Sequence, residues 1–337
     1  MSERRVTIRD VAAAAGVSVT TVSHALNGKG SVDPATRERV IAAAGDLGYR
    51  ASRAARALRS GRTGVIAMLL PAPDTLDAER EMLSLDYYMQ LAMAAAGAAF
   101  ERHHPLLLTP PLKTVAELRE LGVDGGILCD PGRADPRLAL FEELGLPVVT
   151  IERDLGRPEH RWYVRGDNEA NTHELLDHLA DAGATRVAML AAESDWAWSA
   201  ESEQAYRAWC ASRGQEPIVE VTGLHQLEAS AYESGGRLLD RPQRPDAIFA
   251  LAESYATGVV RAARDRGLEV PRDLLVASGI DSQQTREATP PITTIDLLPQ
   301  DQGAAAARLL VERLEGAEPA APVVVPAALR IRASTQP

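Results

Sequence analysis

Short polar side chains that both donate and accept hydrogen bonds are concentrated in residues 18–27, SVTTVSHALN. If this run is helical, its polar side chains share one face and its apolar ones the other. The polar face comprises Thr20, Ser23, His24 and Asn27. Such side chains can hydrogen-bond base edges in a DNA major groove, and Ser18 and Thr21 near the helix start suit phosphate oxygens. A solvated face on a small helical bundle explains the same pattern, so both interpretations stay open at this point.

Residue sets typical of catalysis, metal binding or nucleotide binding do not occur in the sequence. We find no P-loop, no H-E-x-x-H pair and no nucleophile elbow. Residues 27–30, NGKG, resemble a phosphate loop in composition only, since they follow a helix and lack the spacing. His103 and His104 end a helix and are expected at the surface, and neither His173 with His178 nor Cys129 with Cys210 has the spacing of metal ligands. We therefore expect no metal, no cofactor and no enzymatic activity.

Charge is distributed unevenly along the chain. Residues 1–62 contain eleven Lys and Arg against five Asp and Glu, a net charge of +6. The whole chain of 337 residues nevertheless carries a net charge of -11. A basic segment on an acidic protein favours contact between that segment and a polyanion.

The chain shows neither a secretory signal nor a membrane span. Its N-terminus, MSERRVTIRD, has no apolar h-region, and no run of about 18 apolar residues follows. The two cysteines are typical of reduced thiols. We expect a cytoplasmic protein with no membrane partner, and the missing signal argues against a periplasmic solute carrier.

Three short helices are expected in residues 1–50, a helix-turn-helix domain. Thr7 can cap the first helix, Ser18 the second and Asp33 the third. The turn before Ser18 is only about three residues long, which forces the first two helices to cross steeply. The apolar residues expected to pack inward are Ile8, Val11, Ala12, Ala15, Val22, Ala25, Leu26, Val40, Ile41, Ala44 and Leu47.

Residues 51–63 form a basic, alanine-rich linker for which we expect a hinge helix. Arg53, Arg56 and Arg59 are three residues apart and would lie along one flank of it. Leu58 is the large apolar residue among them. An apolar wedge beside arginines suits insertion into a DNA minor groove. Docking of Leu58 on the following domain is the alternative that the linker alone favours.

From residue 64 onward, short apolar strands alternate with helical segments. This repetition predicts two doubly wound parallel sheets, one in each of two lobes. We expect an N-lobe of about 64–163 plus 294–322 and a C-lobe of about 164–293 plus 323–337. A ligand would bind in the cleft between the lobes, at the carboxyl ends of the strands.

The segment VTIRDVAAAAGVSVTTVSHALN closely resembles the DNA-binding head of the lactose-repressor (LacI/GalR) family of bacterial transcription regulators. It matches the family pattern T-x-x-D-V-A-x-x-A-G-V-S-x-x-T-V-S-x-x-L-N at each specified position, and V-x-x-x-T-R-x-R-V follows from Val32. The resemblance implies that Val19, Thr20 and His24 select bases, although relatives commonly have arginine where His24 stands. It also implies a hinge leucine that inserts at the operator centre. The implied DNA contacts are Thr7, Ile8, Ser18, Val19, Thr20, Thr21, Ser23, His24, Asn27, Thr36, Tyr49, Ser52, Ala55, Arg56 and Leu58.

The rest of the chain resembles the core of the same family more loosely, for example in VDGGIL, GLPVVTIER and LLVASGID. Asp281 matches an aspartate that in relatives holds polar groups of the effector, and Glu253 replaces a usual aspartate. Two nearby tryptophans could stack on a ring or sugar face, or could pack against the neighbouring lobe. The implied effector-binding residues are Asp74, Trp196, Trp198, Ser202, Glu253 and Asp281.

One departure from the family bears on the charge of the effector. Relatives often carry an arginine shortly before a Gly-aromatic pair, and residues 201–203, ESE, stand in that place here. Without that cation, an uncharged or cationic effector fits better than a carboxylate or a phosphate.

The expected fold class is therefore an all-α helix-turn-helix head with a hinge helix, joined to an α/β two-lobed periplasmic-binding-protein-like core. The expected function is sequence-specific repression of a metabolic operon by a homodimer on a palindromic, double-stranded DNA operator. A small-molecule effector, a sugar or related metabolite, would control it. With no added heptad helix after RIRAST, we expect a dimer rather than a tetramer. The alternative is a small-molecule-binding protein or enzyme on the same core with only accessory DNA binding.

Overall fold

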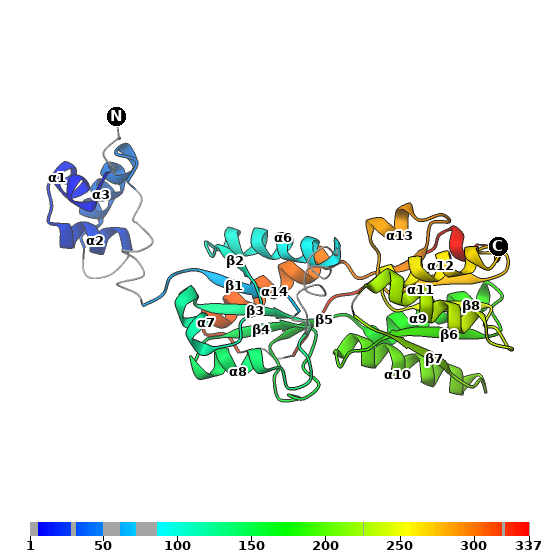
Figure 1. Cartoon of the computed structure of the whole chain (residues 1–337). Helices are drawn as coiled ribbons and strands as arrows, with labels where there is room; N and C mark the ends of the chain where they lie inside the picture. Colours follow the sequence, from blue (N-terminus) through cyan, green and yellow to red (C-terminus); the bar gives the residue numbers. More distant parts are fainter. Residues whose placement is uncertain are drawn as a thin grey trace. The chain divides into compact units, whose positions relative to one another are not determined.

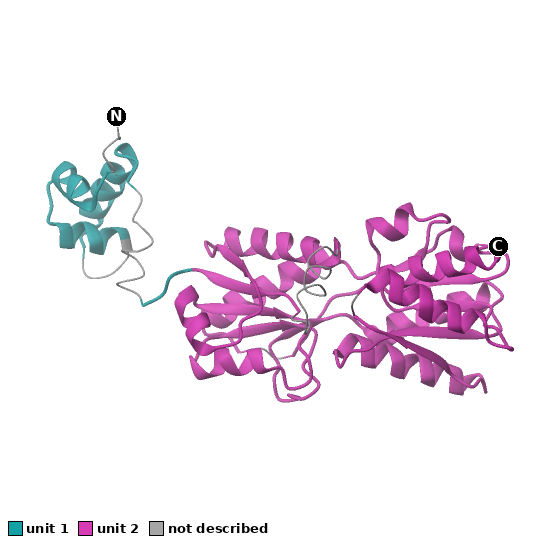
Figure 2. Ribbon diagram, viewed as in Figure 1, with its two compact units in different colours: residues 1–64 teal, residues 65–337 magenta. Residues whose placement is uncertain are grey.

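The chain forms two compact units, Met1–Gly64 and Val65–Pro337, which Figure 2 distinguishes by colour. We call them the head and the core. The computed structural model describes residues 6–27, 32–49, 61–71, 86–224, 226–318 and 321–336. Within these ranges no helix is long and apolar enough to cross a membrane.

The head contains the three expected helices, and their caps are those that the sequence predicts. The helices are α1 (Ile8–Ala15), α2 (Val19–Asn27) and α3 (Pro34–Asp46) (Figure 1). Ser18 Oγ accepts a hydrogen bond from the Thr21 N–H at 3.1 Å, which caps α2. Asp33 caps α3 by accepting from the Thr36 N–H at 3.0 Å. Gly16 ends α1 with a left-handed φ of 64°, which keeps the turn before α2 short.

Apolar side chains from all three helices pack in the middle of the head. The buried ones are Val11, Ala12, Ala15, Val22, Ala25, Val40 and Ala44, with Ile8 and Leu26 packed against them. The expectation that Ile41 and Leu47 pack inward is wrong, because their side chains are 53% and 37% exposed. Ile41 lies about 100° around the helix from Val40, and Leu47 follows the last residue of α3.

The first lobe of the core is a six-stranded parallel sheet in the order β11-β5-β4-β3-β1-β2. Its strands are β1 (Ile66–Leu69), β2 (Leu106–Thr109), β3 (Gly125–Cys129), β4 (Val148–Ile151), β5 (Tyr163–Arg165) and β11 (Val323–Val324). Its helices are α6 (Asp86–Glu101), α7 (Val115–Leu121), α8 (Pro136–Glu143) and α14 (Pro299–Leu314). Ile66 and Met68 pack with α6 and α14, whereas Ala67 and Leu69 pack with α7 and α8. Successive strand residues point to opposite faces, so both faces are covered.

The second lobe is a six-stranded sheet in the order β12-β10-β9-β8-β6-β7, parallel except for β12. Its strands are β6 (Val187–Ala192), β7 (Ile218–Thr222), β8 (Ala247–Ala250), β9 (Leu275–Ser278), β10 (Thr293–Asp296) and β12 (Ala328–Arg330). Its helices are α9 (Asn168–Asp181), α10 (Ala197–Ser212), α11 (Leu227–Leu239), α12 (Glu253–Asp265), α13 (Gln283–Glu287) and the 3-10 helix η1 (Ala333–Thr335). Helix α9 packs on α10, and α11 packs on α12. The helical head and the two doubly wound sheets confirm the expected fold class, while the expected hinge helix over residues 51–63 falls largely on residues 51–60, outside the described ones.

The chain passes between the two lobes at places that differ slightly from the expected ones. Strand β5 pairs with β4 and ends at Arg165, so the first passage follows residue 165 rather than 163. Strand β10 pairs with β9, so residues 294–296 belong to the C-lobe and the second passage follows Asp296. Strand β11 pairs with β5, which places residues 323–324 in the N-lobe. Strand pairing, which hydropathy does not encode, sets these limits.

Candidate functional sites

The second helix of the head presents a polar surface whose start is fixed by hydrogen bonds. Ser18 Oγ and Thr21 Oγ1 lie 2.9 Å apart at its first turn. Val19 is 42% exposed, and the side chains of Thr20 and His24 are exposed as well. The three residues expected to select bases are therefore accessible on α2.

The other expected DNA contacts in the head lie around this helix. Thr7 is exposed and Ile8 half-buried at the start of α1, and Ser23 is half-buried on α2. Thr36 donates its hydroxyl hydrogen to Asp33 Oδ2 at 3.2 Å, and Tyr49 packs against the head core. Of Asn27 only its position at the end of α2 is described. Ser52, Ala55, Arg56, Leu58 and Asp74 lie outside the described residues.

A cavity of about 610 Å³, part of it open to solvent, lies between the two lobes of the core. We call it the main cavity. Its lining side chains follow the carboxyl ends of strands or begin the helices after them, which is where open α/β sheets bind ligands. They are Tyr87, Tyr88, Asp130, Glu152, Asn168, Trp196, Trp198, Leu224, Leu227, Ala252, Glu253, Tyr255, Ile280 and Leu297. The expected residues Trp196, Trp198 and Glu253 thus meet here.

Three buried carboxyl groups line the main cavity. Asp130, Glu152 and Glu253 are 3%, 4% and 2% exposed. Burial raises the pKa of Asp130 to about 6, and burial with the nearby Asp130 charge raises that of Glu152 to about 8. Burial also raises the pKa of Glu253 to about 7. At neutral pH these groups hold protons more strongly than exposed carboxylates do.

The partners of the three carboxyl groups differ. Tyr88 donates its hydroxyl hydrogen to Asp130 Oδ2 at 2.7 Å. Glu152 accepts from the Gly166 N–H and from Asn168 Nδ2, each at 3.1 Å. Both carboxyl oxygens of Glu253 are buried without a hydrogen-bond partner among the described residues. Glu253 is therefore the group in the cavity wall that most lacks a partner.

Unusual backbone conformations turn two of these carboxyl groups toward the cavity. Asp130 directly follows β3 and Glu152 directly follows β4, with φ of 42° and 66°. Their N–H groups still donate to Ile151 O at 2.9 Å and Val164 O at 2.8 Å, so the sheet ladder continues through them. Left-handed non-glycine residues of this kind cluster at ligand sites, where the surrounding structure holds them.

Aromatic side chains make up much of the remaining wall. The rings of Trp196 and Trp198 lie 5.9 Å apart at 32°, and those of Tyr87 and Tyr88 lie 5.1 Å apart at 78°. Tyr87 donates its hydroxyl hydrogen to Gln302 Oε1 at 2.8 Å. The wall can therefore cover apolar or ring surfaces of a ligand while carboxyl groups contact its polar atoms.

Ser202 lines a smaller, neighbouring cavity of about 350 Å³. This side cavity shares wall residues with the main one, namely Asn168, Trp198, Ile280 and Leu297. Thr172 and Asn171 lie in its wall beside Ser202. Ser202 is thus brought near the other candidates but does not line the main cavity.

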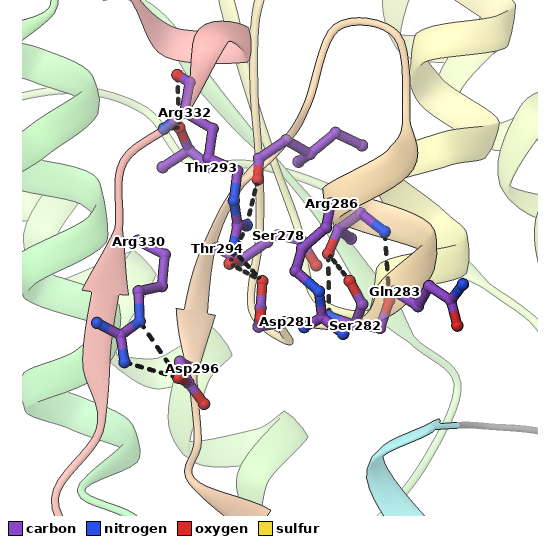
Figure 3. A network of polar contacts seen from close by, with 12 residues as sticks. Ser278, Asp281, Ser282, Gln283, Arg286, Thr293, Thr294, Asp296, Arg330 and Arg332 are labelled. Carbon is purple, nitrogen blue, oxygen red and sulfur yellow. Dashed lines mark hydrogen bonds and ion pairs between the residues drawn. The ribbon is translucent and has the colours of Figure 1, made fainter.

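Asp281 lies in an ion-pair network and lines neither of these two cavities. Its carboxylate contacts Arg332 at 2.7 Å and Arg286 at 2.6 Å, and accepts from Thr294 Oγ1 at 2.7 Å (Figure 3). Burial opposes its ionisation, but hydrogen bonds from Thr294, Arg332 and Arg286 lower the pKa of Asp281 overall. In this arrangement its oxygens join β10, α13 and the segment after β12.

Comparison with known proteins identifies the family. Residues 7–52 match the description "Bacterial regulatory proteins, lacI family", and residues 176–335 match "Periplasmic binding protein-like domain". The HTH-type transcriptional regulator CelR of Thermobifida fusca is 32% identical over 324 residues, which cover 93% of this chain and 93% of that protein. The chain belongs to the LacI family of bacterial regulatory proteins.

Solved structures of LacI-type regulators have the same architecture. The transcriptional regulator CelR–cellobiose complex aligns with a TM-score of 0.72 at 30% identity, over 98% of this chain and 100% of that chain. The lac repressor dimer bound to operator and the anti-inducer ONPF aligns with a TM-score of 0.79 at 22% identity, over 98% and 99%. This second likeness concerns the fold. The LacI-family relatives are named transcriptional regulators, and the present chain is a regulator and not an enzyme.

Several cavity residues were not predicted as site residues for this LacI-family chain. Tyr87, Tyr88 and Asn168 begin helices, and Asp130 and Glu152 end the runs GGILCD and PVVTIE. An acidic residue directly after a buried strand was the signal that could have revealed the last two, because strand ends meet at one edge of the sheet.

Proposed function

We propose that this LacI-family regulator represses transcription as a homodimer on a palindromic operator, and that a small molecule in the main cavity controls its operator affinity. The main cavity supports control by a small molecule, because its wall comes from both lobes. A molecule bound there favours one arrangement of the lobes over another, and can change operator affinity only through that difference. By linkage, DNA changes the affinity for the small molecule by the same factor.

Operator recognition is assigned to α2. Ser18 caps this helix, and its residues Val19, Thr20 and His24 are exposed. Residues 1–62 carry a net charge of +6. Phosphate contacts from the basic head give affinity, and α2 side chains in the major groove give sequence preference. Leu58 is proposed to insert its side chain as an apolar wedge into the minor groove at the operator centre.

The homodimer is supported by an exposed apolar surface on the N-lobe. Met93 and Phe100 are 78% and 69% exposed on α6 and, seven residues apart, lie on one face of that helix. On the adjacent edge strand β2, Leu108 is 42% exposed and shares with Leu106 the face of the sheet that α6 covers. A second copy of the chain is the proposed occupant, because twofold symmetry would also present two heads to two half-sites.

The effector is proposed to be a sugar or a related metabolite. Aromatic rings beside hydrogen-bonding carboxyl groups suit the apolar faces and polar edges of a sugar ring. The relative CelR, 30% identical in its solved structure, is described as a complex with cellobiose. A regulator of this kind works where the operator is, so we infer a cytoplasmic location.

Selection from random duplex DNA by the full chain tests this proposal. A palindromic motif should be enriched, and its affinity for the protein should change when a sugar panel is added. The sign of that change distinguishes an inducer from a co-repressor. Enrichment of no motif, or of a motif without twofold symmetry, would reject operator binding by a homodimer.

A further inference from the structure

Acidic side chains around the main cavity divide into two classes. Asp281 is paired with Arg332 and Arg286, and Glu201 is paired with Arg153 and, at 3.6 Å, with Arg165. These outer carboxylates have their counter-charges within the protein. The described residues that line the main cavity include no Lys, Arg or His, and the one cation that acts on a wall carboxyl group is Arg137, which lowers the pKa of Asp130 from behind the wall without lining the cavity.

The carboxyl group of Glu253 is buried without a well-formed hydrogen bond to any described residue. The residue is 2% exposed and lies in the cavity wall, and among the described residues only its own backbone N–H is near enough to act on its carboxyl, without making a well-formed hydrogen bond to it. Buried polar groups are normally hydrogen-bonded, and a buried charge is normally paired. The missing partner of Glu253 is therefore expected to come from the ligand.

The carboxyl groups of Asp130 and Glu152 share this environment. Each is satisfied only by uncharged donors, a tyrosine hydroxyl in one case and an amide and a backbone N–H in the other. Three carboxyl groups thus line one cavity whose described wall contains no cationic side chain. A cationic ligand group balances them, whereas an anionic one adds to their repulsion.

The aromatic residues of the wall favour the same kind of ligand. The main cavity is lined by Tyr87, Tyr88, Trp196, Trp198 and Tyr255. Aromatic faces attract ammonium groups through their quadrupole, and cages of aromatic rings with carboxylates are used to bind such cations. Ring faces and unpaired carboxyl groups together distinguish this wall from a purely polar one.

We propose that the effector carries a protonated amine, which binds between the carboxyl groups of Glu253, Glu152 and Asp130 against the aromatic wall. This inference rests on the proposed function of the cavity as the effector site. Two sources provide this chemistry, an amino sugar and a polyamine. The raised pKa values of the three carboxyl groups agree with a site whose counter-charge arrives with its ligand.

Calorimetric titration of the full chain with matched ligands tests the inference. The amine probes are glucosamine, its β-1,4-linked dimer and spermidine. Glucose and cellobiose replace the amine with a hydroxyl, and the N-acetylated dimer keeps the nitrogen without its charge. An amine probe should bind at least tenfold more tightly than its hydroxyl counterpart and than its acetylated form. Binding of the sugar dimer but not of spermidine identifies an amino sugar, and the reverse identifies a polyamine.

Substitution of Glu253 tests whether the amine binds at this residue. Glu253→Gln keeps the shape of the side chain and should reduce the affinity for the preferred amine at least tenfold. Glu216→Gln, at an exposed position in the loop before β7, is the matched control and should leave that affinity unchanged. If Glu253→Gln does not fold, the comparison of amine and hydroxyl ligands on the unsubstituted chain still tests whether the cavity prefers a protonated amine.

The outcomes separate this inference from the proposed function. Equal or tighter binding of the uncharged sugars overturns the inference, and so does the lack of binding by every amine probe. If uncharged sugars bind and change affinity for a selected operator, the proposed function stands without the amine. If no operator is selected, the proposed function fails whichever ligand binds.

Discussion

Asn168 Nδ2 donates a hydrogen bond to Glu201 Oε2 at 2.9 Å, and the same nitrogen donates to Glu152 Oε2 at 3.1 Å. Glu152 follows β4 of the N-lobe, whereas Glu201 lies on α10 of the C-lobe. A single amide at the start of α9 therefore ties two carboxyl groups from different lobes together at the cavity wall. Because it contacts both lobes, we expect Asn168 to influence the arrangement of the lobes as well as the stability of the core.

Asn168→Ala should therefore destabilise the core by about 1–3 kcal/mol, because the buried carboxyl group of Glu152 and the partly buried one of Glu201 each lose a hydrogen-bond donor. Urea denaturation followed by tryptophan fluorescence measures this loss, since all four tryptophans lie in the core. Asn171→Ala, one turn along α9, is the matched control, because Asn171 Nδ2 is buried without a hydrogen-bond partner. Equal destabilisation by the two substitutions would show that the bridge contributes nothing specific.

The stability of the ligand-free core should decrease as pH rises from about 4.5 to about 7, in part because of Glu253. Its carboxyl has a pKa of about 7 in the folded core, above its usual 4.5. Below pH 4.5 the group is neutral in both states and imposes no penalty. As pH rises through 7 the folded state must bury a charge that the unfolded state exposes, so stability is lost.

Glu253→Gln should remove this contribution and make the core more stable than the unsubstituted one at pH 8, by about 3 kcal/mol. Denaturation curves at pH 5, 6, 7 and 8 measure the difference, which should shrink toward pH 5. Glu216→Gln should follow the unsubstituted protein throughout. A gap between the two proteins that does not change with pH would exclude titration of Glu253 as its cause.

Local signals in the sequence predict most of the fold. Cap residues such as Ser18 and Asp33 mark helix starts because a side-chain oxygen must satisfy the free N–H groups there. Apolar runs predict the buried strands of both lobes, because a parallel sheet covered on both faces needs apolar side chains at successive positions. The passages between lobes are less accurate, because the short strands β5, β10 and β11 are assigned by the partners they pair with.

The candidate site is predictable only in part, because it depends on partners far away in the sequence. Trp196, Trp198 and Glu253 follow strand ends and do line the main cavity. Asp281 also follows a strand, but Arg332 arrives from the far end of the chain and pairs with it. Asp130 reaches the cavity through a left-handed backbone conformation, which no residue preference of aspartate alone predicts.

Replacing His24 with arginine should change the sequence of the selected operator. His24 is exposed on α2, and an arginine there offers a two-pronged donor that matches guanine O6 and N7. Such a contact discriminates between bases by about 1–3 kcal/mol. Parallel selections with the unsubstituted chain and His24→Arg compare the enriched motifs. His173→Arg on α9 adds the same charge to the core and should leave the motif unchanged, and an unaltered motif for His24→Arg would show that position 24 is not read.

Leu58→Ala should weaken operator binding about tenfold or more while leaving the head folded. Removing the proposed wedge deprives the kinked base step of the apolar side chain that fills it. Fluorescence anisotropy on a selected operator measures the affinity, and circular dichroism checks the helices. Leu47→Ala is the control, since Leu47 is 37% exposed in the head and has no assigned DNA contact. If Leu58→Ala and Leu47→Ala bind alike, Leu58 has no wedge role.

Met93→Glu and Phe100→Glu should each convert the homodimer to monomer at micromolar concentration. Both side chains are largely exposed on one face of α6, and a C2 interface buries each of them twice. Loss of apolar burial together with an unpaired carboxylate should weaken dimerisation by about 3 kcal/mol, roughly a hundredfold in dissociation constant.

Sedimentation velocity across a range of concentrations measures the change. Val324→Glu is the control, because Val324 is 52% exposed on β11, at the opposite edge of the same sheet from β2. It should leave the dimer intact. Because a palindrome binds two heads, the α6 variants should also lose affinity for the full operator while keeping affinity for a half-site. A dimer that survives both α6 substitutions would place the interface on another surface of the core.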